Sequence, residues 1–382
     1  MSQPAQIFHN GPVFDGQRLR TGVAAVFENG VLTDLRESAT FPIDAQTIDL
    51  GGDILSIGFV DLQVNGGGGV MFNDNPSLAT LRLMAEVHRG LGVTHLLPTL
   101  ITDNADITRR AIAAAIDAVQ AKVPGIAGLH LEGPHLSVAR KGAHDAALVR
   151  DMTEEDLAAL LEAAEQLPCL KLTIAPESVT EAQVARLSEA GVLISLGHSD
   201  ADFDTCQRYI AAGACCVTHL FNAMSQIGNR APGLAGAAIA NGAVSAGLIA
   251  DGVHVHQEVM RMAWAAKRGP GTLFLVSDAM AVAGTSETEF ELDGRRIERR
   301  GGQLRLSDGT LAGADLDLVT AVSTLVTQVG INLEQALTAA TSAPATLCGL
   351  TEHALVAGQT QLTDSIRIKS DLSNATPLIA GL

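Results

Sequence analysis

The feature that most constrains this chain is an alternation of short apolar segments with alanine-rich helical stretches, which begins near Ile57. Alternation of this length is typical of a parallel sheet, and eight units predict a closed (β/α)8 barrel of the TIM type. The predicted strands are Gly58–Val64, Thr94–Ile101, Gly125–Leu131, Leu170–Pro176, Leu193–Gly197, Cys216–Leu220, Ala246–Ala250 and Leu273–Val276. The predicted helices include Asn104–Lys122, Thr153–Gln166, Thr180–Ala190, Asp315–Val329 and Leu333–Ala340.

The segments outside this alternation predict additional β structure. Near the N-terminus, short strands are separated by Asn-Gly turns, which favour hairpins. They are Gln6–Phe8, Gly22–Glu28 and Val31–Arg36. We therefore expect a small β module over residues 1–57, a barrel over 58–349, and a C-terminal part of the module over 350–382. A hairpin insertion is expected near 289–307, with Asp293-Gly294 at its turn.

Composition narrows the class of protein. A formal charge of −17 repels a polyanion, and 3 % aromatic residues leave few side chains for base stacking, so nucleic acid is not an expected partner. No apolar run has membrane-spanning length, and the N-terminal residues lack a signal core. The five cysteines are odd in number and show no CxxC spacing. We therefore expect a reduced, cytoplasmic protein that binds no membrane.

Polar side chains follow several predicted strands at their carboxyl ends, where barrel enzymes carry their active sites. Glu132, His198 and His219 come from three different strands, and one carboxylate with two imidazoles makes a plausible Zn²⁺ site with an open position. Asp278 follows the eighth strand and could exchange a proton with water and a leaving amine. Taken singly, each histidine is more often a structural residue, and Asp278 could cap a helix. The joint pattern favours a metal-dependent hydrolase.

Eight motifs occur in an order that resembles the N-acetylglucosamine-6-phosphate deacetylase family of the amidohydrolase superfamily. They are GFVDLQVNGGGG, LHLEGPH, KGAHD, GHSDA, THLFNAM, APGLAG, IADGVHVH and VSDAM, and they span about Gly58 to Gly349. The resemblance implies a metal-centred barrel flanked by a small β-sandwich built from both chain ends. It also implies hydrolysis of N-acetylglucosamine 6-phosphate to glucosamine 6-phosphate and acetate, in amino-sugar catabolism or recycling.

The resemblance further implies roles for individual residues. Glu132, His198 and His219 match the metal ligands, and Asp278 matches the proton acceptor and donor. Arg230 matches an arginine that reaches the sugar phosphate from the neighbouring subunit, which implies a homodimer. The other matched substrate contacts are Ala143, His144, Asn222, Ala223, His254, Leu311, Ala312 and Gly313.

Three departures qualify these expectations. Many amidohydrolases have His-x-His at the end of the first strand, but this chain has Gln63-Val64-Asn65. Because an amide is a poor ligand for a transition metal, we expect one divalent ion per chain, Zn²⁺ with Fe²⁺ as the alternative. ADLDL follows GTLAG where the family has a serine-rich segment, and the tail lacks the family's usual ending. The last strands of the β module are therefore expected to be irregular.

Other functions stay open at this point. The same machinery could act on N-acetylgalactosamine 6-phosphate, which differs at one hydroxyl. A cyclic-amide hydrolase would commonly bridge two metals with a modified lysine, but the fourth strand closes in TIAPE without a lysine. An inactive barrel that serves as a binding protein is disfavoured by the intact set of Glu132, His198, His219 and Asp278.

Overall fold

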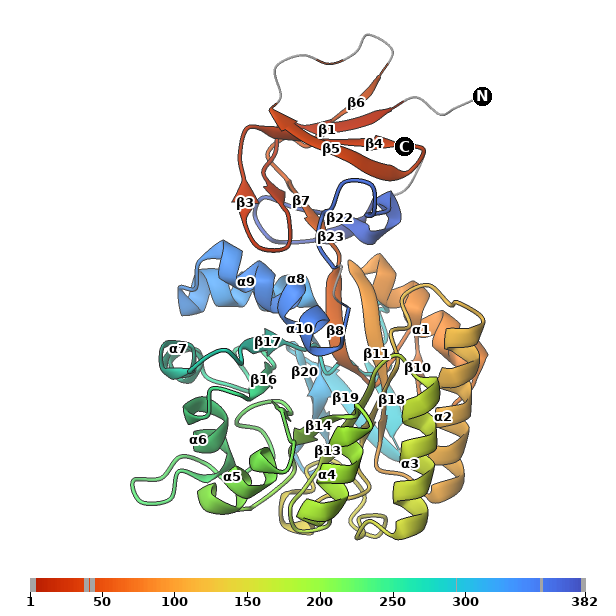
Figure 1. The fold of residues 1–382 in the computed structure, drawn as a ribbon, viewed down its shortest axis with the longest axis vertical. Coiled ribbons are helices and arrows are strands. Elements are labelled where there is room, and N and C mark those ends of the chain that lie inside the picture. The colour runs from red at the N-terminus through yellow and green to blue at the C-terminus, as the bar shows by residue number, and fades with distance from the viewer. Residues whose placement is uncertain (1–4, 38–40, 42–44, 293, 351–352, 379–382) are drawn as a thin grey trace.

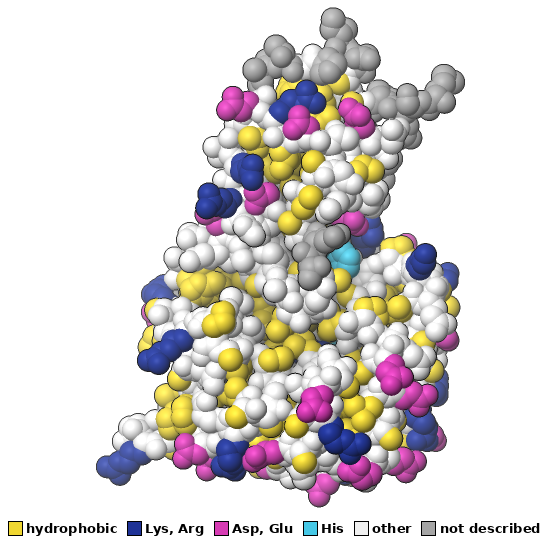
Figure 2. Space-filling model, in the orientation of Figure 1, with side chains coloured by type: hydrophobic (Ala, Val, Ile, Leu, Met, Phe, Trp, Pro, Cys, Tyr) yellow, Lys and Arg dark blue, Asp and Glu magenta, His cyan; other side chains and the backbone are white. Residues whose placement is uncertain are grey.

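The computed structural model describes residues 5–37, 41, 45–292, 294–350 and 353–378 of the chain. Within these residues the protein consists of an α/β barrel and a small β module stacked at one end of it (Figure 1). No helix in the described ranges is both long enough and apolar enough to cross a membrane. Acidic and basic side chains are intermixed over the face drawn in Figure 2, without a continuous basic surface.

Eight parallel strands form the barrel, in the order β17-β16-β15-β14-β13-β12-β11-β8. Their bounds are β8 Phe59–Val64, β11 Val93–Ile101, β12 Leu129–Glu132, β13 Leu170–Ile174, β14 Leu193–Leu196, β15 Cys216–Val217, β16 Ser245–Leu248 and β17 Leu273–Leu275. The two edges of this sheet meet just beyond β17, where Asp278 N donates to Gln63 O at 3.1 Å and Asn65 N donates to Ala279 O at 2.8 Å. The predicted barrel and all eight predicted strands are therefore confirmed.

Helices surround the barrel because both faces of a parallel sheet must be covered. They are α1 Leu78–Gly90, α2 Ala105–Gln120, α3 Glu154–Gln166, α4 Glu181–Glu189, α5 Phe203–Ala211, α6 Gly233–Ala240, α7 Gln257–Ala266, α8 Leu318–Thr324, α9 Leu333–Ala340 and α10 Ser342–Leu347. Short 3-10 turns occupy Val138–Arg140 and Leu362–Asp364, and a π-helical turn at Leu325–Val329 extends α8. A capping box is present at the start of α3, where the side chains of Thr153 and Asp156 accept hydrogen bonds from each other's backbone amides.

The small module consists of two sheets. One has the order β5-β4-β1-β6, and the other has the order β23-β22-β7-β2-β3. The strands are β1 Gln6–His9, β2 Val13–Phe14, β3 Leu19–Arg20, β4 Val23–Glu28, β5 Val31–Glu37, β6 Gln46–Asp49, β7 Ile54–Ile57, β22 Ser365–Ile368 and β23 Ala375–Pro377. The C-terminal β22 pairs antiparallel with β7, which continues directly into β8. The prediction of irregular last strands is therefore wrong for β22 and β23, because β22 pairs with β7 and β23 pairs with β22. These pairings give the two strands a regular structure that their atypical sequence does not predict.

The insertion after β17 is larger than the predicted hairpin. It is a four-stranded antiparallel sheet of β18 Glu289–Leu292, β19 Arg295–Arg300, β20 Gln303–Leu306 and β21 Leu311–Ala314. Asp293, at the predicted turn, lies outside the described residues. Leu292, Ile297 and Leu304 pack in one buried cluster with Met280, which follows β17. A two-stranded ribbon, β9 Gly66–Gly67 and β10 Val70–Met71, adds Met71 to this cluster. The insertion therefore packs against the end of the barrel at which the strands finish.

Candidate active site

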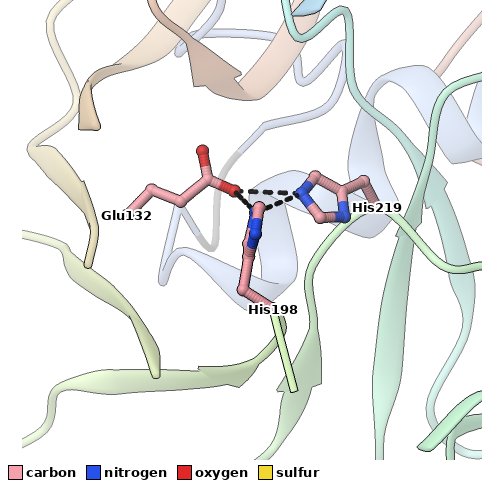
Figure 3. A group of neighbouring side chains, drawn as sticks. All are labelled: Glu132, His198 and His219. Atoms are coloured by element: carbon pink, nitrogen blue, oxygen red, sulfur yellow. Dashed lines mark hydrogen bonds and ion pairs between the residues drawn. The ribbon is translucent and has the colours of Figure 1, made fainter. Parts of the chain in front are cut away.

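Three potential metal ligands converge at the carboxyl ends of the barrel strands (Figure 3). Glu132 is the last residue of β12, whereas His198 and His219 follow β14 and β15 by two residues. Glu132 Oε1 lies 3.2 Å from His198 Nε2 and 3.1 Å from His219 Nε2, and the two Nε2 atoms lie 3.0 Å apart. We call these three residues the triad.

The geometry of the triad fits a small divalent cation. Bonds of 2.0–2.1 Å in a tetrahedral site put neighbouring ligand atoms about 3.3 Å apart, close to the separations found here. His198 Nδ1 donates to Arg140 O at 2.9 Å, which leaves Nε2 as the unprotonated nitrogen of a neutral ring. His219 Nδ1 is buried without a hydrogen-bond partner among the described residues. The donor set and the tautomer of His198 therefore suit a metal.

The triad is almost inaccessible to solvent, with relative exposures of 2 % for Glu132, 4 % for His198 and 5 % for His219. Burial alone would raise the pKa of Glu132, but its contacts with the two imidazoles outweigh burial and hold that pKa well below the usual value. The same carboxylate raises the pKa of His219 against the opposing effect of burial. Glu132 is thus a buried negative charge, as a cation site requires.

The backbone around the triad is held in an unusual conformation. His198, His219 and Asp278 all have positive φ, at 47°, 29° and 51°. Residues other than glycine rarely adopt this region, and such positions concentrate at functional sites. The turns that leave β14, β15 and β17 therefore aim these side chains at the cost of local strain.

Asp278 lies beside the triad, and its carboxylate accepts hydrogen bonds from two amide side chains. Asn65 Nδ2 donates to Asp278 Oδ1 at 2.7 Å, and Gln63 Nε2 donates to the same oxygen at 3.1 Å. Gln63 Nε2 also lies 3.2 Å from Glu132 Oε1. Burial raises the pKa of Asp278, and the nearby charge of Glu132 raises it further. The two amides thus act as hydrogen-bond donors that hold two carboxylates in place.

A cavity of about 400 Å³ opens over the triad and Asp278. Most of the residues selected from the sequence line it. These are Glu132, Ala143, His144, His198, Asn222, Ala223, His219, His254, Asp278, Leu311 and Gly313. Ala312, between two lining residues, is fully buried with its side chain in the cluster under the insertion. The cavity therefore gathers residues that lie up to 248 positions apart along the chain, counting from Asn65 to Gly313.

Besides the buried Ala312, Arg230 is the other selected residue that does not line the cavity. It is exposed and lies in the loop that precedes α6. This loop projects from the barrel (green, Figure 1). An arginine that serves a partner's site would occupy such a position.

Two histidines that line the cavity have hydrogen-bond partners on their Nδ1 atoms. His254 Nδ1 lies 2.6 Å from Asp251 Oδ2, a contact that fixes the ring and leaves Nε2 for a ligand. His144 Nδ1 lies 2.8 Å from Thr102 Oγ1. Burial, followed by the neighbouring His198, lowers the pKa of His144 to about 3. His144 is therefore neutral at physiological pH and can act as a hydrogen-bonding group rather than as a cation.

The sequence did not single out several residues that line the cavity. Ile101, Leu292, Arg305, Thr310 and Met280 all do so. Leu292, Arg305 and Thr310 belong to the insertion, where strand alternation cannot indicate which face meets the barrel. His135, three residues after Glu132, is 2 % exposed, and its Nδ1 lies 3.1 Å from Arg150 O.

A parallel eight-stranded barrel whose strand ends carry a buried carboxylate, two imidazoles and a second carboxylate defines a class of protein, the metal-dependent barrel hydrolases. Comparison with known proteins narrows this class. The chain belongs to the Amidohydrolase family, whose model matches residues 54–354.

Several similar proteins are named as deacetylases of phosphorylated amino sugars. An N-acetylgalactosamine-6-phosphate deacetylase of Shewanella sp. (strain ANA-3) is 44 % identical over 83 % of this chain and 80 % of the relative. An N-acetylglucosamine-6-phosphate deacetylase of Haemophilus influenzae is 34 % identical over 86 % of each chain. The crystal structure of N-acetylglucosamine-6-phosphate deacetylase from Pasteurella multocida superposes with a TM-score of 0.91 at 33 % identity, covering 97 % of both chains.

Proposed function

We propose that this chain hydrolyses the acetamide of N-acetylglucosamine 6-phosphate to glucosamine 6-phosphate and acetate, in amino-sugar catabolism or recycling. The observation that carries this proposal is one cavity that joins the buried triad, Asp278 and a ring of small and polar groups. The relatives named above support the substrate class. N-acetylgalactosamine 6-phosphate is a second candidate, because the 44 % identical relative carries that name.

The metal of the proposed reaction would be held by Glu132, His198 and His219. We expect one divalent ion per chain, Zn²⁺ with Fe²⁺ as the alternative, because Gln63 and Asn65 already donate to the carboxylates from the first strand. Such an ion would polarise the acetamide carbonyl and promote ionisation of water.

The remaining chemistry falls to the chain's own residues. Asp278 accepts a proton from the attacking water and returns it to the nitrogen of the departing amine. The amides of Gln63 and Asn65 hold its Oδ1, so that Oδ2 is left for proton transfer. Its raised pKa matches a group that must first take up a proton and then release it.

The sugar would be oriented by the rest of the cavity. The loop after β12 carries His144, and the loop after β15 carries Asn222 and Ala223. The insertion contributes the backbone of Leu311–Gly313. Ala312 contributes there through its backbone, because its side chain is buried. His254, fixed by Asp251, would contact the phosphate side.

The proposed assembly is a cytoplasmic homodimer in which Arg230 of one subunit reaches the phosphate bound by the other. The exposed position of Arg230 before α6 supports this arrangement. Arginine suits the task, since its planar fork donates two parallel hydrogen bonds to a phosphate.

Acetate release from a panel of substrates tests the proposal. Metal-loaded protein should release acetate from N-acetylglucosamine 6-phosphate with a kcat/KM well above that for the unphosphorylated sugar. Chelation should abolish the activity, and added Zn²⁺ or Fe²⁺ should restore it. A higher kcat/KM for the galactosamine epimer would select the second candidate. No acetate from either phosphate at full metal content would overturn both.

A further inference from the structure

The active-site cavity is lined by one cationic side chain to which the proposed function gives no role. Arg305, on β20, is the one lysine or arginine among the described residues that line it. The cavity also contains the carboxylates of Glu132 and Asp278, and the whole chain carries a formal charge of −17. A phosphorylated ligand therefore meets a negative field from the protein, in which a single local cation has a large effect on binding.

The charge of Arg305 is not neutralised by a carboxylate within the described part of the chain. Its Nε donates to Gln303 Oε1 at 2.8 Å, and its Nη1 donates to Gly309 O at 2.5 Å. Glu298 lies opposite Arg305 in the register of β19 and β20, but its carboxylate is 3.4 Å from Arg296. Two neutral acceptors thus orient the guanidinium and leave its charge, and N–H groups on the terminal nitrogens, for a ligand.

Hydrogen bonds fix the conformation of the turn that joins β20 to β21, next to Arg305. Arg305 pairs in register with Leu311, which also lines the cavity. The turn between them is closed by a hydrogen bond from Leu306 N to Thr310 O of 2.9 Å and by one from Thr310 N to Asp308 Oδ1 of 2.9 Å. Gly309, whose carbonyl receives the guanidinium, has a φ of +88°, which a residue with a side chain rarely adopts. The arginine is therefore held in place before a ligand arrives.

We propose that Arg305 is a phosphate anchor supplied by the same chain that supplies the triad, in addition to any arginine from a partner. This inference rests on the proposed function, and it assigns to the insertion a role in selecting phosphorylated over neutral N-acetyl sugars. Because a guanidinium can donate two hydrogen bonds to one phosphate, replacing it with lysine should restore part of the binding and replacing it with alanine none.

The test compares Arg305→Ala, Arg305→Lys and a control, Arg268→Ala. Arg268 is exposed in the segment before β17, at the opposite end of the barrel strands, so its loss changes the net charge equally without touching the cavity. Arg305→Ala should raise KM for the sugar 6-phosphate about 10- to 100-fold, the range for a hydrogen bond between charged groups. It should raise the inhibition constant of inorganic phosphate similarly, and it should leave the metal content and the rate on unphosphorylated N-acetylglucosamine unchanged. Arg305→Lys should lie between alanine and wild type.

If the wild type is active on the sugar phosphate, either of two results would overturn the assignment of Arg305 as a phosphate anchor. One is a KM for Arg305→Ala equal to that of Arg268→Ala. The other is an equal loss of activity on phosphorylated and unphosphorylated sugars, which would make Arg305 a structural residue of the insertion. Inactivity of the metal-loaded wild type on every sugar would instead count against the proposed function.

Discussion

Replacement of Asp278 by asparagine separates the proposed proton transfer from the metal site. Asparagine keeps an oxygen that can accept from Asn65 Nδ2 and Gln63 Nε2, now at 2.7 and 3.1 Å from Asp278 Oδ1. It also removes a buried negative charge that faces Glu132. The side chain should therefore stay in place, and neither the fold nor the triad should be lost.

The expected loss is in the rate of the chemical step. Loss of a general base costs about 10²- to 10⁴-fold, which is about 3 to 5.5 kcal/mol in the barrier. We expect kcat of Asp278→Asn to fall by this factor with KM and metal content near wild type. Acetate release under saturating substrate, with elemental analysis of the same samples, measures both quantities. Asp117→Asn, on the exposed side of α2, is the matched control for loss of one carboxylate.

Two outcomes would refute this reasoning. A kcat of Asp278→Asn within about threefold of the control would remove Asp278 from proton transfer, because a general base is worth far more than that. Loss of the metal together with activity would make Asp278 a ligand.

Three further predictions concern the metal, the assembly and the pH dependence of stability. His219→Ala should lose metal and activity together, and limiting metal should restore wild type at about one ion per chain; a requirement for two ions would contradict the single-metal site. Mixing inactive Arg230→Ala and Asp278→Asn subunits should recover activity in isolated heterodimers, whereas no recovery there would exclude a shared site. His353, whose Nε2 lies 2.8 Å from Gly58 O, is buried, and burial is the main cause that lowers its pKa to about 4. The unfolded chain takes up that proton near pH 6.5, so the free energy of unfolding should be unaffected above pH 6.5 and should fall by up to about 3 kcal/mol between pH 6.5 and 4. Urea titrations of His353→Gln should show a shallower loss over this interval, and an unchanged slope would refute the assignment.

Much of the architecture could be predicted because it depends on local patterns. Each barrel strand is a short apolar run between helical stretches, and such runs are buried on both faces of a parallel sheet. The capping residues Thr153 and Asp156 act within four residues of each other. The triad could be selected for a related reason: strand ends in a barrel meet on one rim, so position along the chain predicts proximity in space.

Other features depend on which residues meet across long separations. The amides of Gln63 and Asn65 stand where the family often has metal ligands, but only the closure of β8 against the segment after β17 decided that they donate to Asp278. Hydrogen bonds over such distances in sequence depend on the stagger of the barrel strands, which no local pattern encodes.

The sequence by itself determined the barrel, the order of its strands and the chemical identity of the triad, because hydrophobic periodicity and strand ends are local properties. The tertiary structure alone decided which face of the insertion meets the barrel. It thereby brought Arg305 to a cavity formed mainly by residues about 60 to 240 positions away along the chain. It also ordered the C-terminal strands, because β22 pairs with β7, some 300 residues earlier, and β23 pairs with β22. The physical reason is the same in both cases: the partner that covers a given face or edge of a β-strand is distant in the sequence, so the strand's own residues do not identify it.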